Sequence, residues 1–165
     1  MKTKVRVSSM GLIAILFFAV WLTSACERTF TRNANGSLGV QTSITQQQLQ
    51  SAIQSSLADP LITELNVQLQ SGYALVTGQR KRVNDNSKTD TLTFRLDLGV
   101  ANGQLTATVS DALLDNVALD QNRVSVWNQT IANRIEDIAR RAPNVTLQSV
   151  TVAPDSVTMN WQVTK

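Results

Sequence analysis

The chain has 165 residues, with 15 Lys or Arg, 12 Asp or Glu and no His, so it lacks the commonest general base and a frequent zinc ligand. Three of the cations, Lys2, Lys4 and Arg6, precede an apolar segment, and the chain beyond that segment holds 12 basic and 12 acidic residues. A neutral domain lacks the basic face that nucleic acids require, so we predict no nucleic-acid partner. Because the chain has no histidine and no recognisable phosphate-binding or calcium-binding motif, we also predict no enzyme activity, no metal and no cofactor.

The first 25 residues have the layout of an export signal peptide. An apolar run over residues 10–22 follows the three cations, and its 13 residues fall short of the roughly 20 that span a bilayer. The segment Leu22-Thr23-Ser24-Ala25-Cys26 resembles the lipobox of bacterial lipoproteins. This resemblance implies cleavage before Cys26 and attachment of acyl chains, such as palmitate, at that residue.

We therefore expect an exported protein, lipid-anchored to the outer face of the cytoplasmic membrane or to the outer membrane. A lone cysteine can also be a small buried hydrophobe, and some sites of this kind release proteins without lipid. Residues 26–42 are polar with no sustained period, which predicts a flexible tether. Residues 43–165 would form a single domain.

A helix is predicted over residues 46–57. Thr45 and Gln48 have the spacing of a capping box, and Asp59-Pro60 would end the helix. Its apolar side chains, Leu49, Ala52, Ile53 and Leu57, recur at helical spacing.

The pattern then changes to a period of two, which predicts antiparallel strands with one apolar face. Residues 65–69 and 73–77 would form one hairpin, joined by Ser71-Gly72. Residues 92–98 and 105–109 would form a second, with the tight turn at Asn102-Gly103.

The last third of the chain predicts a second helix, over residues 124–142, ended by Pro143. Two strands follow, at residues 145–152 and 157–163, and the first of them loses its alternation between Leu147 and Val150, which indicates a β-bulge. The predicted fold is α+β in the order α-β-β-β-β-α-β-β, a curved antiparallel sheet of about six strands packed on two helices.

The span from about 43 to 165 resembles the LmeA-type phospholipid-binding domains of the tubular lipid-binding (TULIP) superfamily. The similarity lies in the capped helix starting Thr45-Gln46-Gln47-Gln48-Leu49, the strand pair at residues 65–69 and 74–78, the strand at residues 103–109, a late helix and a final strand pair. The resemblance implies a sheet cradled around a helix, a hydrophobic groove, and lipid binding or transfer in the cell envelope. It brings no catalytic residues.

Candidate binding residues follow from this fold. The groove between sheet and helix would be lined by Phe94, Leu113, Leu114, Trp127, Ile131, Met159 and Trp161. Residues 110–120, which include two of these, read either as a buried crossover or as an apolar lip at the groove mouth. Arg80, Lys81 and Arg82 would meet anionic lipid headgroups, or would simply be solvated.

Two functions fit these features. The first is a membrane-anchored lipoprotein that binds or transfers a phospholipid through the groove. The alternative is a non-enzymatic envelope scaffold or assembly subunit that binds a protein partner through its polar sheet face or a sheet edge.

Overall fold

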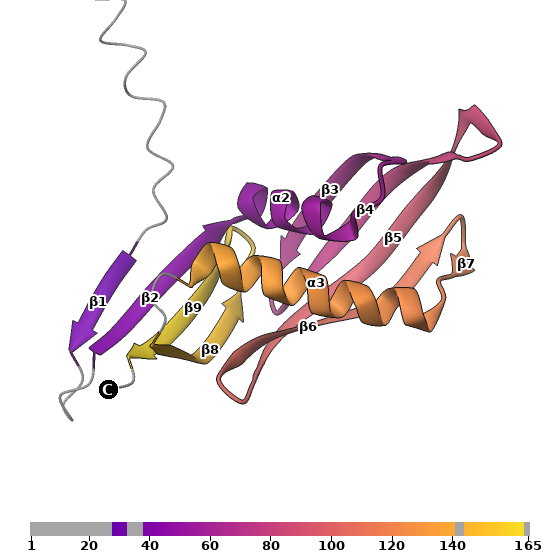
Figure 1. Cartoon of the computed structure of the whole chain (residues 1–165). Helices are drawn as coiled ribbons and strands as arrows, with labels where there is room; N and C mark the ends of the chain where they lie inside the picture. The colour runs from indigo at the N-terminus through magenta and orange to yellow at the C-terminus, as the bar shows by residue number, and fades with distance from the viewer. Residues whose placement is uncertain (1–27, 33–37, 141–143, 164–165) are drawn as a thin grey trace, which may run out of the picture.

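The computed structural model describes residues 28–32, 38–140 and 144–163 (Figure 1). Within them it contains two helices and nine strands in two antiparallel sheets, which confirms the α+β class. The elements are β1 (Arg28–Arg32), β2 (Leu38–Thr45), α2 (Gln46–Leu57), β3 (Ile62–Gln70), β4 (Tyr73–Arg82), β5 (Asp85–Ala101), β6 (Gln104–Leu114), β7 (Val117–Ala118), α3 (Gln121–Ala139), β8 (Val145–Val152) and β9 (Ser156–Val163). None of the helices in the described residues has the length and hydropathy of a membrane span.

The sheet differs from the single sheet of about six strands that the sequence predicted. One sheet has the order β1-β2-β9-β8 and the other β3-β4-β5-β6-β7. They meet where the β3–β4 and β5–β6 turns reach β8: the Gly72 N–H donates to the Val152 carbonyl at 3.0 Å, and the Leu147 N–H donates to the Gly103 carbonyl at 2.8 Å. The turns of one sheet thus abut the edge strand of the other, which interrupts side-by-side pairing.

The predicted tether at residues 26–42 is wrong for the residues that the structure describes. β1 pairs with β2, and β2 pairs with β9 along the whole run from Gly39 to Thr45. The inward phase of β2 includes Thr42, a polar residue that is 2 % exposed and accepts a hydrogen bond of 2.9 Å from Trp161 Nε1. This buried hydroxyl breaks the apolar alternation, which explains why the segment read as polar linker.

Both helices begin at side-chain caps. Thr45 Oγ1 accepts from the Gln48 N–H at 3.3 Å, and Gln48 Oε1 accepts from the Thr45 N–H at 2.9 Å, which confirms the capping box. At α3 the Asp120 side chain is the cap and accepts from the Asn122 and Arg123 amides at 2.9 and 3.4 Å. That cap was missed, so α3 starts before the predicted residue 124; it ends at Ala139, and residues 141 and 142 lie outside the described part.

The predicted hairpin turn and bulge are confirmed. Asn102 and Gly103 have φ of 54° and 75°, the left-handed pair that a two-residue turn needs, and they join β5 to β6. In β8 the register shifts between Leu147 and Ser149, where the alternation was seen to slip.

The core lies between the helices and one face of both sheets. α2 and α3 pack against each other on that face, α3 mainly over β6 (Figure 1). Phe94 of β5 meets Trp127 of α3 with ring centroids 5.7 Å apart. The fully buried side chains include Leu49, Ile53, Leu96, Ile131, Ile135 and Met159, drawn from both helices and both sheets.

The helices also cap the edges of the five-stranded sheet. Gln46 and Gln50 of α2 accept hydrogen bonds, each of 3.3 Å, from the Leu69 and Val67 amides of β3. On the opposite edge, Asn128 and Glu136 of α3 accept from the amides of β6. Unpaired edge amides invite pairing with other chains, so these side chains protect the sheet.

Candidate binding site on the open face of the five-stranded sheet

The helices leave the second face of the five-stranded sheet uncovered. On β4, Ala74 and Val76 point into the core, whereas Leu75, between them, is 39 % exposed on the open face. A pocket of about 490 Å³ lies on this face, lined by Tyr73, Leu75, Val76, Thr77, Thr93, Phe94, Arg95, Asp111 and Leu113. We take this pocket as the candidate site.

A β-bulge shapes one wall of the pocket. The pairing of β5 with β6 shifts between Thr93 and Arg95, and Asp111 occupies the left-handed region with φ of 51°. Beyond the bulge Leu114 pairs with the buried Leu92, so the preceding Leu113 faces the open side, opposite Thr93. The bulge therefore places a second leucine on the same face as Leu75.

A fixed cation forms the other wall. The Arg95 guanidinium lies 4.1 Å from the centre of the Tyr73 ring and donates to both carboxylate oxygens of Asp97, at 2.8 and 2.6 Å. The hydrogen bond from Arg95 lowers the pKa of Asp97; partial burial opposes this shift and the Arg95 charge reinforces it. Because Arg95 is held on two sides, the rim is preorganised before anything binds.

The seven predicted groove residues do not share one surface. Phe94, Trp127, Ile131, Met159 and Trp161 are each at most 6 % exposed and belong to the core. Leu114 is half-buried against the same core, and Leu113 lies on the opposite face of the sheet. The space between the sheets and α3 is thus occupied by the side chains that were expected to line a groove there.

Residues 110–120 are not a buried crossover, and the groove at whose mouth they would have formed an apolar lip is filled by core side chains. β6 continues to Leu114, Asp115 and Asn116 form a turn with φ of 51° and 64°, and β7 pairs back onto β6. Val117 in β7 is 68 % exposed.

Two of the three predicted headgroup residues have acidic partners. Arg80 donates to Asp59 at 2.7 Å, and Arg82 donates to Asp90 at 2.5 Å, whereas Lys81 is exposed. Pairing of this kind reduces the positive field that would attract an anionic membrane surface.

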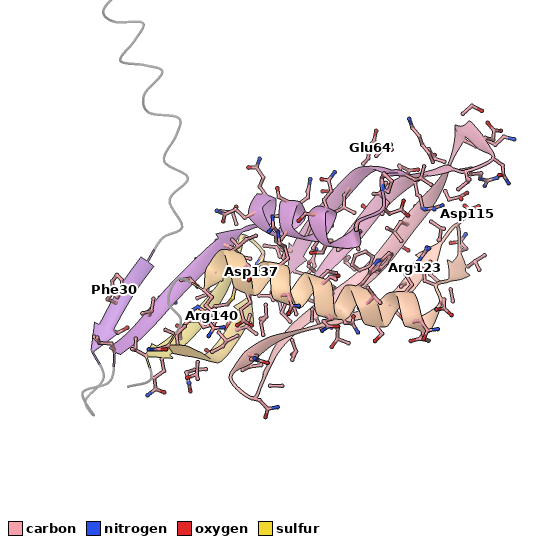
Figure 2. The ribbon with its side chains drawn as sticks, in the orientation of Figure 1. Phe30, Glu64, Asp115, Arg123, Asp137 and Arg140 are labelled. Carbon is pink, nitrogen blue, oxygen red and sulfur yellow. The ribbon has the colours of Figure 1, made fainter. Side chains whose placement is uncertain are left out.

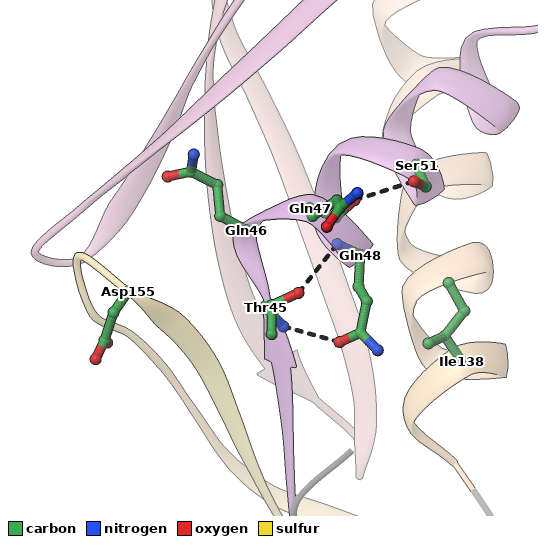
Figure 3. Close-up of a pocket in the computed structure, with 7 residues that line it drawn as sticks. All are labelled: Thr45, Gln46, Gln47, Gln48, Ser51, Ile138 and Asp155. Carbon is green, nitrogen blue, oxygen red and sulfur yellow. Dashed lines mark hydrogen bonds between the residues drawn. The ribbon is translucent and has the colours of Figure 1, made fainter. Parts of the chain in front are cut away.

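A second pocket, of about 650 Å³, opens at the start of α2 (Figure 3). Thr45, Gln48 and Ser51 line it, but Thr45 and Gln48 form the capping box, and the Ser51 hydroxyl donates to the Gln47 carbonyl at 3.0 Å. These polar groups are therefore already hydrogen-bonded within α2 and its cap. Across the described residues, no three or more His, Cys, Asp or Glu side chains gather so as to hold a metal ion.

Sequence reasoning missed the open-face pocket, although one signal for it was present. Residues 73–76 read Tyr-Ala-Leu-Val, so apolar side chains lie on both faces of the strand. Those on one of the two faces must point away from the core. No comparable signal in the sequence indicates the bulge at Asp111.

Comparison with known proteins gives no assignment: no family model matches the chain, and neither the curated proteins nor the solved structures yield a match.

Proposed function

We propose that this protein is a lipid-anchored, non-enzymatic adaptor of the cell envelope that binds a protein partner on the open face of its five-stranded sheet. The observation that carries the proposal is the uncovered pocket around Leu75 and Leu113. Leu75 and Leu113 lie together within a polar rim, an arrangement that favours contact with an apolar group of a partner.

The chemistry of the pocket defines the partner. Leu75 and Leu113 would receive an apolar side chain, and the pair Arg95–Asp97 at the rim would exclude partners that present an unpaired charge. Thr77 and Thr93, which face each other across β4 and β5, offer hydroxyl groups to the partner's polar atoms. A rigid rim lowers the entropy lost on binding.

The anchoring half of the proposal rests on the lipobox-like segment that ends at Cys26, which lies outside the described residues. Two or more acyl chains would hold the protein on a membrane durably, since each buried methylene contributes about 0.8 kcal/mol.

A second candidate is the binding of a lipid acyl chain in the same pocket. The apolar side chains of Leu75 and Leu113 favour it, as does the resemblance to LmeA-type domains. A lipid between the sheets and α3 would instead have to displace Trp127 and Ile131, which are 6 % and 0 % exposed.

The two candidates are separated by photo-crosslinking of the full-length, lipid-anchored protein in intact cells. A photo-crosslinking amino acid is placed at position 75, at position 113 or, as a control, at position 126, where Val126 is 58 % exposed on α3. We expect positions 75 and 113 to give the same protein adduct and position 126 to give none of it. Leu75→Glu should remove the adduct formed from position 113.

Adducts to lipid alone at positions 75 and 113 would establish the second candidate. Equal labelling at all three positions, or adducts at position 126 only, would overturn the open face as a binding site. Native mass spectrometry of the purified protein supplies a separate check on any bound lipid.

A further inference from the structure

We infer that the β1 end of the molecule lies in the membrane interface, with the Phe30 side chain inserted among the lipids. The inference rests on the proposed anchor at Cys26 and adds to it an orientation and a second membrane contact. Its occupant is a lipid surface.

The first argument is the length of chain between the anchor and the fold. β1 begins at Arg28, two residues after Cys26, and an extended chain spans at most about 3.6 Å per residue. The start of β1 is therefore within about 7 Å of the acylated residue, and Phe30 within about 14 Å. A flexible tether over residues 26–42 would have allowed a far greater distance between the membrane and the folded domain. Because β1 belongs to the fold, that distance is short.

The second argument is an apolar row that leaves the core at this end. Leu147, Trp161, Val40 and Phe30 are paired in succession across β8, β9, β2 and β1. Leu147 and Trp161 are 2 % and 3 % exposed, Val40 is half-buried, and Phe30 is 68 % exposed. The inward face of the sheet thus continues past the cover of the helices and presents an aromatic ring to the outside.

Leu38 extends this surface. It lies two residues before Val40, on the same face of β2, and is 49 % exposed. Aromatic and aliphatic side chains next to a lipid anchor lower the free energy of the system by entering the membrane interface. A second hydrophobic contact also fixes the orientation of the protein, which a single anchor leaves free.

Charge points to the same occupant. Residues 26–32 contain Glu27, Arg28 and Arg32 and so carry a formal net charge of +1, a sign that an anionic lipid surface attracts. Figure 2 shows Phe30 at one end of the molecule and Asp115 at the other. At the Asp115 end, Arg80 and Arg82 are paired with carboxylates.

The test uses the mature, lipid-anchored protein in vesicles of phosphatidylethanolamine and phosphatidylglycerol, with or without bromine on the acyl chains. Phe30→Trp introduces an exposed indole, while the native Trp127 and Trp161 are 6 % and 3 % exposed and give the background signal. Val117→Trp is the matched control, because Val117 has the same 68 % exposure and lies in β7 at the far end.

We expect bromine on the acyl chains to lower the emission of the Phe30→Trp protein, and to lower that of the Val117→Trp protein by no more than it lowers that of the unsubstituted protein. An unquenched Phe30→Trp, or equal quenching of both variants, overturns the inference.

Intact mass of the same samples separates the two proposals. Acylated protein without quenching at position 30 contradicts only the membrane contact of β1. Protein that lacks acyl chains contradicts the anchor, and with it the premise of this inference.

Discussion

The side-chain carbonyl of Asn128 on α3 accepts a hydrogen bond of 2.8 Å from the backbone N–H of Val109 in β6. The helix thereby fills a position that another strand would occupy in a longer sheet. Gln50 makes the equivalent contact with Val67 on the other edge, so each helix both covers the core and closes one edge of the five-stranded sheet.

Asn128→Ala should lower the free energy of unfolding by about 1–3 kcal/mol, because the Val109 amide loses its acceptor in a partly buried place. Asn128→Asp keeps an oxygen that can accept this bond, so it should lower the free energy of unfolding less than Asn128→Ala does. Urea denaturation measures both, with Asn133→Ala, on the exposed side of α3, as the control. Equal stability of the Asn128→Ala and Asn133→Ala variants would contradict the capping role.

Thr42→Val should destabilise the protein by about 1–3 kcal/mol, because it leaves the indole N–H of Trp161 buried without a partner. Trp161→Phe removes that donor. The double variant should therefore lose less free energy of unfolding than the sum of the losses in the Thr42→Val and Trp161→Phe single variants. Thermal or urea unfolding of the four proteins gives the coupling directly. Strict additivity would show that the hydrogen bond contributes nothing.

Asp111→Gly and Asp111→Ala should differ in stability by about 1 kcal/mol, in favour of glycine. The residue has φ of 51° at the bulge, a conformation that glycine adopts freely and alanine does not. If the bulge places Leu113 correctly, the glycine variant should still give the adduct from position 113. Identical unfolding free energies for the two variants would rule out backbone strain at this position.

Asp59 should contribute to acid sensitivity. Burial raises the pKa of Asp59, but the hydrogen bonds from Arg80 and the Leu61 amide, with the charges of Arg80 and Arg123, together hold that pKa below its ordinary value of 3.8. The ion pair therefore stabilises the fold above pH 3.8, and this contribution is lost as the pH falls below that value through the lowered pKa.

Asp59→Asn should accordingly be less stable than the natural protein at neutral pH, and the difference should shrink in acid. Asp137→Asn removes one exposed carboxylate from α3 and serves as the control. Unfolding free energies measured from pH 7 down to pH 2 test the point; a constant difference between the Asp59→Asn variant and the natural protein would refute it.

Local signals in the sequence predicted the elements well where local chemistry decides them. The capping pair Thr45 and Gln48 fixed the start of α2, and Asn102-Gly103 fixed a turn, because both act through neighbouring backbone groups. The bulge in β8 was visible for the same reason: a phase slip is a local event.

What escaped prediction depends on contacts between distant segments. Thr42 reads as polar until Trp161 is known to supply its hydrogen bond, 119 residues away. Leu113 faces outward only because Asp111 interrupts the ladder with β5. The position of Leu113 in the open-face pocket and the pairing of β1 with β2 both follow from such long-range contacts, which residue periodicity does not encode.

The junction between the two sheets is made by main-chain atoms of Gly72, Val152, Gly103 and Leu147. It therefore constrains the lengths of two turns, and the left-handed conformations of Gly72 and Gly103 constrain which side chains those positions accept. Inserting a residue into either turn would displace these main-chain atoms and break the hydrogen bonds between the sheets. A side-chain change at an exposed position of β8 would leave those bonds in place.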